Sequence, residues 1–335
     1  MTDAAATPRS AELPSTADVL SLVFSSEPDG TVSEVVFVLG ASGSGRSRAT
    51  ARLLVESPGL AVVRSEDLAA LHPLAGDARA RDVAGEVDRA TVGWLQACLR
   101  HAREAKHSLI LDAAFTDPAV VFQTAARFRA DGFRSRVVVT AARRAESLLA
   151  TVSGHLRASR TPQAVPPLDV TAHDKALAAT RVVVEESLTS GIERVSILHR
   201  SGVTAHDTDR DTIAGETGGS LAAYDQAQRV PLGTVRSALW LSELHRCTEF
   251  VQSQDRPARP VVSALVELHD LAATQIIPEL NVRKDADLVT RQLRSHAADA
   301  AELRRRLTLT GLAGDATRPA IPPPTVEQPG AGLGR

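Results

Sequence analysis

The sequence predicts an α/β protein in which helices cover both faces of a parallel sheet and a helical appendage follows. Three observations lead to this fold class. Short runs rich in β-branched residues alternate with longer segments that have helical spacing. Each run is continuously apolar, which is typical of strands buried on both faces. After about residue 208 the strand pattern stops and only helical patterns continue.

The elements can be placed in order along the chain. Strands are expected at residues 34–39, 60–64, 108–113, 135–142 and 193–199. The helices between and after them are expected at residues 46–56, 82–106, 117–131, 143–158 and 171–190. Three prolines within residues 159–171 interrupt the helical pattern, so a mobile loop or lid is expected there. The appendage is expected to contain helices at residues 231–255, 260–276 and 284–308.

With 335 residues, 43% of them apolar, the chain can form one full α/β core and a second element. Residues 31–207 are expected to form the α/β domain and residues 208–310 the helical appendage. Residues 1–30 and 311–335 offer little apolar surface and are expected to be largely disordered. The amphipathic-looking stretch 17–24 raises the hypothesis that this N-terminal segment docks on the fold and restrains it.

Charge and cysteine content exclude several classes of function. Lys and Arg total 38 against 40 Asp and Glu, so no general field favours nucleic acid or an acidic membrane surface. Cys98 and Cys247 belong to no CxxC pair, which indicates neither a disulfide framework nor a zinc site. The sequence has no run of 18 apolar residues and no secretory signal. We therefore expect a soluble, cytoplasmic protein with neither nucleic acid nor membrane as a partner.

A glycine-rich loop follows the first expected strand and precedes a helix. It fits the phosphate-binding pattern G-x-x-x-x-G-K-[ST] at every specified position except the lysine, which is Arg46. Glycines let backbone amides turn toward phosphates, and the helix N-terminus adds positive potential. We expect ATP to bind there with Mg²⁺, the ion being held by the Ser47 hydroxyl. The expected nucleotide-binding residues are Gly40, Ala41, Ser42, Gly43, Ser44, Gly45, Arg46 and Ser47.

Two other interpretations of this loop remain open. It could be a plain strand-to-helix turn that uses glycine for positive φ. It could also open a dinucleotide-binding unit, with Glu66 as the distant acid, but Arg48 then stands where the third glycine should be. Arg46 keeps its charge and offers a planar fork to phosphate oxygens, whereas lysine is a compact point charge. Arg46 could also be an ordinary solvated helix residue.

Together with this loop, four further segments resemble the zeta toxin family in order and spacing over about 175 residues. They are SEDLAALHP at 65–73, ILDAAFTDPAVVFQTAARFRADGF at 110–133, AHD at 172–174 and VSILHRSG at 195–202. The resemblance implies a P-loop kinase fold that transfers the γ-phosphate of ATP to a small-molecule acceptor. In the family, that acceptor is a sugar hydroxyl of UDP-N-acetylglucosamine. It also implies a protein antitoxin that covers the nucleotide site.

The resemblance assigns catalytic roles as well. It implies that Glu66, with Asp67 beside it, is the general base, that Arg46 acts on the phosphates, and that Asp112 binds the substrate. The two acids could instead simply begin a helix, and Asp112 could be a capping or ion-paired core residue. His173, next to an acid near a helix start, is expected to pack rather than to catalyse.

Several positions depart from the family pattern. The Gly-Thr pair after the third strand is replaced by Ala113-Ala114, and the arginine that follows by Thr116. Two arginines flanking the lid are replaced by Gly154 and Pro166, with Arg157 and Arg160 close enough to substitute for one of them. These departures concern the acceptor and the transition state, where a single arginine is worth orders of magnitude in rate. Two functions therefore remain: an ATP-dependent small-molecule kinase, and a catalytically weak nucleotide-binding protein that acts through a partner.

Overall fold

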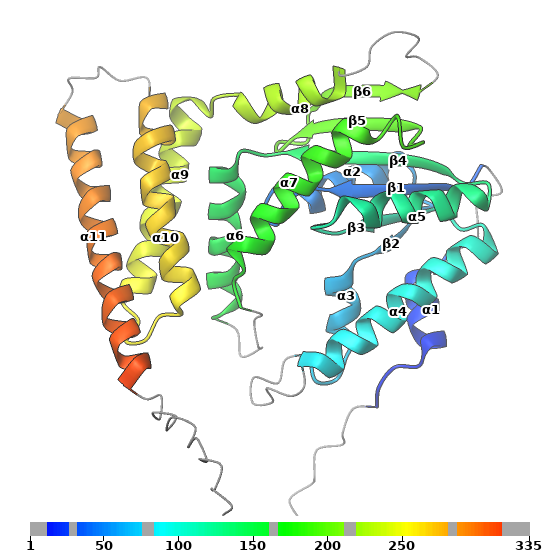
Figure 1. Cartoon of the computed structure of the whole chain (residues 1–335), viewed down its shortest axis with the longest axis horizontal. Coiled ribbons are helices and arrows are strands. Elements are labelled where there is room, and N and C mark those ends of the chain that lie inside the picture. The colour runs from blue at the N-terminus through cyan, green and yellow to red at the C-terminus, as the bar shows by residue number, and fades with distance from the viewer. Residues whose placement is uncertain are drawn as a thin grey trace, which may run out of the picture.

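The computed structural model describes residues 12–26, 32–75, 84–160, 167–210, 219–280 and 287–316. Within them, the chain forms a layered α/β domain and a group of long helices on one side of it (Figure 1). Residues 161–166 of the expected lid and the expected C-terminal tail from residue 317 lie outside the described residues.

The sheet has six strands in the order β2-β3-β1-β4-β5-β6. The first five in this order are parallel, which confirms the predicted fold class, whereas β6 runs antiparallel to β5. Their bounds are β1 Glu34–Leu39, β2 Ala61–Val63, β3 Leu109–Asp112, β4 Arg134–Ala141, β5 Arg194–His199 and β6 Thr204–Asp209. Strand β6 was not expected, because it is an edge strand of polar residues and has no apolar run.

Helices cover both faces of the sheet, because successive strand residues point to opposite sides. Phe37 and Leu39 lie in the larger core, whereas Val36 and Val38 lie in a smaller core with α2 (Arg46–Glu56). The larger core is closed by four helices. In Figure 1, α4 Ala84–Ala105, α5 Pro118–Ala130 and α7 Val170–Glu186 lie in front of and below the sheet, and α8 Gly219–Arg229 lies along its upper edge beside β6.

A third core lies between α6 (Arg144–Ala158) and the C-terminal helices. We call these C-terminal helices the helical unit: α9 Gly233–Gln252, α10 Arg259–Leu271 and α11 Asp287–Ala316. Helix α10 continues into a π-helical turn, Ala272–Ile276, and a 3₁₀ turn, Ile277–Glu279. Residues 259–279 are long and apolar enough to cross a membrane, but half of that stretch is buried inside the protein, as in the core helix of a bundle.

The α/β core extends beyond the expected boundary between residues 207 and 208. That boundary falls inside β6, and α8 beyond it packs on β5 and β6 with Tyr224 fully buried. Helix α8 was not predicted, because it begins within the glycine-rich stretch 214–219, which indicates a loop.

The segment expected to be largely disordered at the N-terminus contains one short helix. This is α1 (Thr16–Val23), which begins with a capping box between Ser15 and Asp18. It packs on α4 and β2, with Val19 buried in the larger core. Residues 1–11 and 27–31 lie outside the described part of the chain.

Candidate active site

The loop between β1 and α2 has the backbone of a phosphate-binding turn. Gly40, Gly43 and Gly45 have φ of +143°, +74° and +108°, values that side-chain-bearing residues rarely adopt. Space also requires glycine, because a Cβ on Gly43 would lie 2.3 Å from the carbonyl oxygen of Ser147. The loop therefore packs directly against α6. We call residues 40–47 the phosphate loop.

Two contacts fix the shape of the phosphate loop. Thr140 at the end of β4 donates its hydroxyl hydrogen to the carbonyl oxygen of Leu39 at 3.1 Å, so Ser44 Oγ is the donor in its 2.6 Å bond to Thr140 Oγ1. Arg200, after β5, donates from Nε to the carbonyl oxygen of Gly43 at 3.1 Å.

These contacts leave part of the loop backbone available for a ligand. Within the described residues, the amides of Gly43, Gly45 and Arg46 have no acceptor in the protein. Those of Gly45 and Arg46 lie at the N-terminus of α2, where the helix dipole favours an anion.

Arg46 binds acids at the ends of the neighbouring strands. Its Nη1 donates to Asp112 Oδ1 at 2.7 Å, and its Nη2 lies 3.7 Å from Glu66 Oε1. Arg64, at the end of β2, donates from Nε to Asp112 Oδ2 at 2.6 Å, and Thr50 donates to the same oxygen at 2.8 Å. The fold thus brings together Arg46, Glu66 and Asp112, which the sequence assigned to one site.

Asp67 joins the same group from its edge, 3.5 Å from Arg64 Nη1. We call these two arginines and three acids the acid–arginine network. Asp112 is its buried centre, with a side chain only 2% exposed, whereas Glu66 and Asp67 are 64% and 68% exposed. Burial alone would lower the pKa of Arg64, but its bonds and charge interactions with Asp112 and Asp67 outweigh burial and raise it, so the guanidinium stays charged.

The positions of Glu66 and Asp67 bear on both interpretations of these acids. They occupy the first turn of α3 (Ser65–Ala70), so they do begin a helix, where a negative charge is favourable. They also lie past the end of β2 on the side of the phosphate loop, as the contact of Glu66 with Arg46 shows. An exposed carboxylate in this place is free to accept a proton from a bound hydroxyl.

Ser47 and Asp112 differ in whether their oxygens are available to a magnesium ion. Ser47 is exposed on the first turn of α2 and, within the described residues, its hydroxyl bonds to no protein group, so it can serve as a ligand. The carboxylate of Asp112 has both oxygens occupied by arginine and threonine donors. Ser47 therefore fits a magnesium ion as the sequence suggests, and Asp112 does not fit one unless Arg46 moves.

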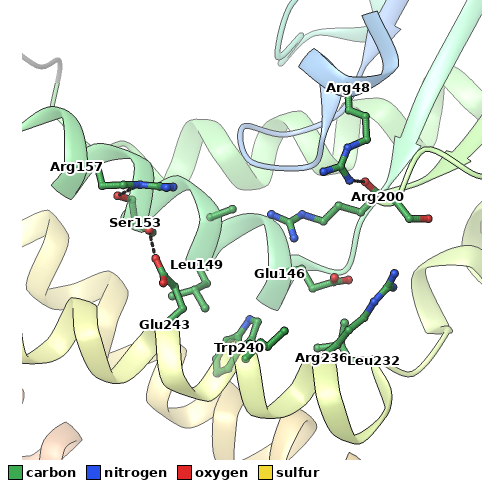
Figure 2. Close-up of a pocket in the computed structure, with 13 residues that line it drawn as sticks. Arg48, Glu146, Leu149, Ser153, Arg157, Arg200, Leu232, Arg236, Trp240 and Glu243 are labelled. Carbon is green, nitrogen blue, oxygen red and sulfur yellow. Dashed lines mark hydrogen bonds between the residues drawn. The ribbon is translucent and has the colours of Figure 1, made fainter. Parts of the chain in front are cut away.

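A cavity of about 470 Å³ is lined by Arg48, which directly follows the phosphate loop, and by Arg200, which bonds to it. Figure 2 shows Arg48 and Arg200 on one wall, α6 behind them, and Trp240 and Arg236 of α9 opposite. The indole nitrogen of Trp240 donates to the carbonyl oxygen of Ala145 at 3.1 Å, which holds α9 against α6. We call this space the larger cavity; one of its walls comes from the helical unit.

A second space of about 280 Å³, the smaller cavity, is bordered directly by the phosphate loop. It is lined by Ser42 of the loop, by Ala114 and Thr116 after β3, and by Thr151 and His155 of α6. Thr116 thus lines this cavity at the position of a family arginine. Arg157 lines the larger cavity, and Arg160 lies over the ring of Phe250 at 4.4 Å.

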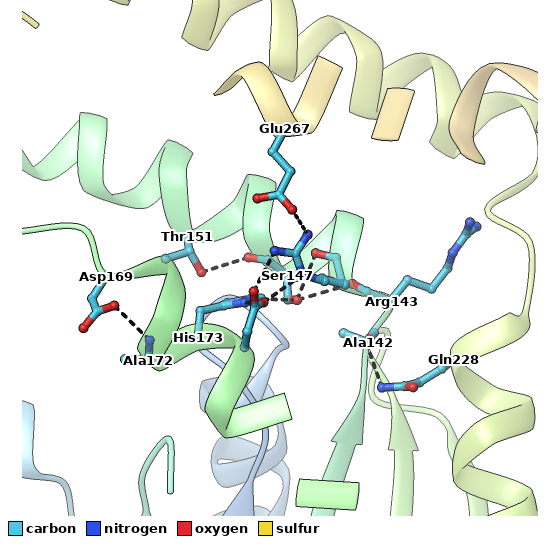
Figure 3. Close-up of polar contacts among 11 residues, drawn as sticks. Ala142, Arg143, Ser147, Thr151, Asp169, Ala172, His173, Gln228 and Glu267 are labelled. Carbon is cyan, nitrogen blue, oxygen red and sulfur yellow. Dashed lines mark hydrogen bonds and ion pairs between the residues drawn. The ribbon is translucent and has the colours of Figure 1, made fainter. Parts of the chain in front are cut away.

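His173 is a packing residue, as expected. It is buried on α7, and its ring nitrogens bond to Ser147 Oγ and to Asp174 Oδ1, both at 3.0 Å. Burial lowers its pKa, so the ring is neutral. Arg144 of α6 forms a two-pronged ion pair with Asp174 and another with Glu267 of α10, so this cluster joins three helices (Figure 3).

Four residues of the site were missed by sequence reasoning: Thr50, Arg64, Thr140 and Arg200. Two of them carried a usable signal. Arg64 directly follows a strand and precedes Glu66, and Thr50 stands one turn after Arg46 on α2. Thr140 and Arg200 touch the loop from strands 96 and 157 residues away in sequence, a separation that no local pattern bridges.

The chain is similar to known proteins in sequence and in fold. The model of the family described as Zeta toxin matches residues 24–211. No curated protein sequence matches the chain. A structure from the PezAT chromosomal toxin-antitoxin system of Streptococcus pneumoniae is similar with a TM-score of 0.58 and 14% identity, covering 71% of this chain and 95% of that one. A structure of AvrRxo1-ORF1:-ORF2 with ATP has a TM-score of 0.47 and 14% identity, covering 76% and 84%.

Proposed function

Because the chain belongs to the zeta toxin family, we propose that it is an ATP-dependent kinase that transfers the γ-phosphate to a hydroxyl of a small molecule. A nucleotide sugar such as UDP-N-acetylglucosamine is the first acceptor to test. The observation that carries this proposal is the phosphate loop, whose backbone amides at the start of α2 have no acceptor among the residues that the structure describes, with the acid–arginine network beside it.

Phosphate binding, magnesium binding and proton transfer are assigned to different residues of the site. The loop amides and the N-terminus of α2 bind the phosphates, and Ser47 would hold Mg²⁺. The ion, when bound, neutralises charge on the phosphate oxygens. Glu66 orients the acceptor hydroxyl and accepts its proton, and Arg46, once released from Asp112, stabilises charge on the transferred group.

The two cavities suggest where the substrates lie. The larger cavity, with a volume within the range of small-molecule sites and four arginines around it, takes the nucleoside end of ATP. The smaller cavity takes the acceptor, because it is lined by the residues after β3 and by the start of α7. On this proposal, the helical unit contributes Arg236 and Trp240 to nucleotide binding.

A second function is supported by the pairing of Arg46 with Asp112. A cation already bound to a buried carboxylate must exchange partners before it can act on phosphate, which slows or weakens catalysis. The position of the family arginine is also occupied by Thr116. The alternative is therefore a catalytically weak nucleotide-binding protein that acts through a partner, and an antitoxin protein over the nucleotide site is the partner to look for.

Transfer of labelled phosphate from ATP to a panel of nucleotide sugars, measured beside ATP binding by calorimetry, separates these functions. Product formation that falls at least about a hundredfold in Glu66→Gln supports the kinase. Asp67→Asn tests whether the neighbouring acid shares that role, and Glu56→Gln, an exposed acid at the far end of α2, is the control. ATP binding without any product favours the alternative, and no ATP binding contradicts both functions.

A further inference from the structure

Two buried histidines face each other inside the helical unit. His269 of α10 and His296 of α11 are 1% and 5% exposed, and their Nδ1 atoms are 2.9 Å apart. We call them the histidine pair. Neutral imidazoles have a lone pair available for a metal ion.

The tautomer of His269 follows from its other neighbour. Thr248 donates its one hydroxyl hydrogen to the carbonyl oxygen of Leu244 at 2.9 Å. It can therefore only accept a hydrogen in its 3.0 Å bond with His269 Nε2. His269 then carries its proton on Nε2, and the lone pair on its Nδ1 points at His296. A hydrogen bond from the distal ring nitrogen is how metal-binding histidines are oriented.

Asp299 supplies a third ligand atom. It stands one helical turn after His296, a spacing that puts both side chains on the same face of α11. The three potential ligand atoms of His269, His296 and Asp299 lie within 4.8 Å of one another. A cavity of about 430 Å³, lined by His296, Asp299 and His245, opens beside them and gives an ion a route from solvent.

The geometry points to a zinc site formed by His269, His296 and Asp299, with a water from the cavity as the fourth ligand. Two nitrogens and a carboxylate from the protein are a common ligand set for zinc. Nitrogens about 2.0–2.1 Å from a tetrahedral ion lie about 3.3 Å apart. The histidine pair therefore has to separate by about 0.4 Å for zinc to enter, starting from its 2.9 Å hydrogen bond.

Such an ion would join α11 to α10 at the end of the chain described. These helices pack along their length, and Arg304 of α11 also forms an ion pair with Asp270 of α10. The competing explanation for the cluster is a metal-free pair in which His296 donates a hydrogen bond to His269. A zinc site predicts that the chain binds zinc through these residues, whereas a metal-free pair predicts that it does not.

The test uses the full chain, stripped of metal with EDTA and free of nucleotide. ZnCl₂ is titrated in competition with a chromogenic chelator, and Co²⁺ is then used to record a visible ligand-field band. We expect about one ion per chain, a tetrahedral Co²⁺ spectrum without thiolate bands, and at least tenfold weaker binding in His296→Ala and in Asp299→Asn. His101→Ala, a histidine on α4, is the matched control and should bind as the unsubstituted chain does.

Thermal melting keeps the test decisive if His296→Ala does not fold. Asp299 is only partly buried, so Asp299→Asn is the variant expected to fold, and zinc should raise the melting temperature of the unsubstituted chain but not of this variant. Absence of zinc binding, equal binding by Asp299→Asn and by the unsubstituted chain, or a thiolate–Co²⁺ band would overturn the proposal.

Discussion

Arg46 occupies the one position at which the phosphate loop departs from its pattern, and in the structure it is bound to Asp112. ATP phosphates would compete with that carboxylate for the same guanidinium. We expect Arg46→Ala to weaken ATP binding by about 1.5–3 kcal/mol, the range for a hydrogen bond to a charged group. Calorimetry with Mg²⁺-ATP measures this loss. Equal and negligible binding by Arg46→Ala and by the unsubstituted chain would refute a phosphate-binding role for the loop.

Arg46→Lys restores the usual loop sequence. It tests whether Arg46 or Thr116 is the departure from the family pattern that limits catalysis. Lysine can release Asp112 to Arg64 and Thr50, but Thr116 still stands where the family has an arginine. We therefore expect ATP affinity to hold and the rate of phosphate transfer to remain within about tenfold of the unsubstituted chain. A larger rise in the transfer assay would identify arginine at position 46 as the main defect.

Asp112→Asn tests the acid–arginine network from its buried centre. Removing one member of a buried ion pair costs about 3–5 kcal/mol, because the remaining charges lose their partner, so the free energy of unfolding should fall by an amount of that order. ATP should bind at least as tightly as before, because Arg46 and Arg64 are freed for phosphate. Urea unfolding and calorimetry measure the two effects. Asp67→Asn, exposed and on the rim, should change stability by no more than about 0.5 kcal/mol.

The site could be predicted from the sequence where its signal is local. The glycines of the phosphate loop adopt positive φ as their spacing indicates, because the loop needs that backbone whatever surrounds it. The pairing of Arg46 with Asp112 joins positions 66 residues apart and depends on β1 and β3 lying side by side. Sequence reasoning placed both residues at one site but not in one ion pair.

At the scale of elements, the segments with clear end signals were predicted best. Strand β1 and helix α2 have the expected bounds, because β1 is a continuous apolar run and glycines separate it from α2. Strand β6 and helix α8 were missed for the opposite reason. Strand β6 is polar along its length, and helix α8 begins in a stretch of glycines. Both elements depend on tertiary contacts with β5, which no local pattern predicts.

Helix α1 docks on the fold as the sequence suggested, but not over the phosphate loop. It packs on α4 and β2, whereas the loop packs on α6 and bonds to β4. Val19→Asp should therefore lower the free energy of unfolding by at least about 1.5–3 kcal/mol, the value of burying a valine, and leave ATP affinity unchanged. Chemical denaturation and calorimetry measure these two quantities. Leu22→Asp, at a side chain 63% exposed on the same helix, is the control.

This position revises the earlier hypothesis about the N-terminal segment. If the N-terminal segment restrained the nucleotide site, removal of residues 1–30 would raise ATP affinity or toxicity. A helix that packs on α4 and β2 instead predicts lower stability with the same affinity. Tighter ATP binding by Val19→Asp would restore the restraint hypothesis.

At the scale of the whole molecule, α6 belongs to both parts of the protein. Its Ser147 and Thr151 approach Gly43 of the phosphate loop, and its Leu148 and Val152 lie in the core shared with the helical unit. The helical unit is therefore fixed to the same helix that supports the loop. Helix α6 therefore contacts the phosphate loop on one side and the helical unit on the other.

The same junction predicts that acid destabilises the protein. Burial lowers the pKa of His173 below its ordinary value of 6.5, against the opposing effect of Asp174 on α7, with Arg144 of α6 and Glu267 of α10 close by. Just below pH 6.5, His173 is therefore protonated in the unfolded chain but remains neutral in the folded protein. Stability contributed by neutral His173 is complete above about pH 6.5 and is lost as the pH falls below it, by at most about 1.4 kcal/mol per pH unit.

His173→Gln should remove this contribution to the pH dependence. Glutamine cannot take up a proton, so between pH 7.5 and pH 5.0 the free energy of unfolding should fall less steeply in the variant than in the unsubstituted chain. Urea unfolding at several pH values in this range measures both slopes, above the pH at which Asp174 is protonated. His245→Gln, with a side chain 60% exposed, is the control. If His173→Gln and the unsubstituted chain lose stability in parallel, His173 is not the group that makes the α6–α7–α10 junction sensitive to acid.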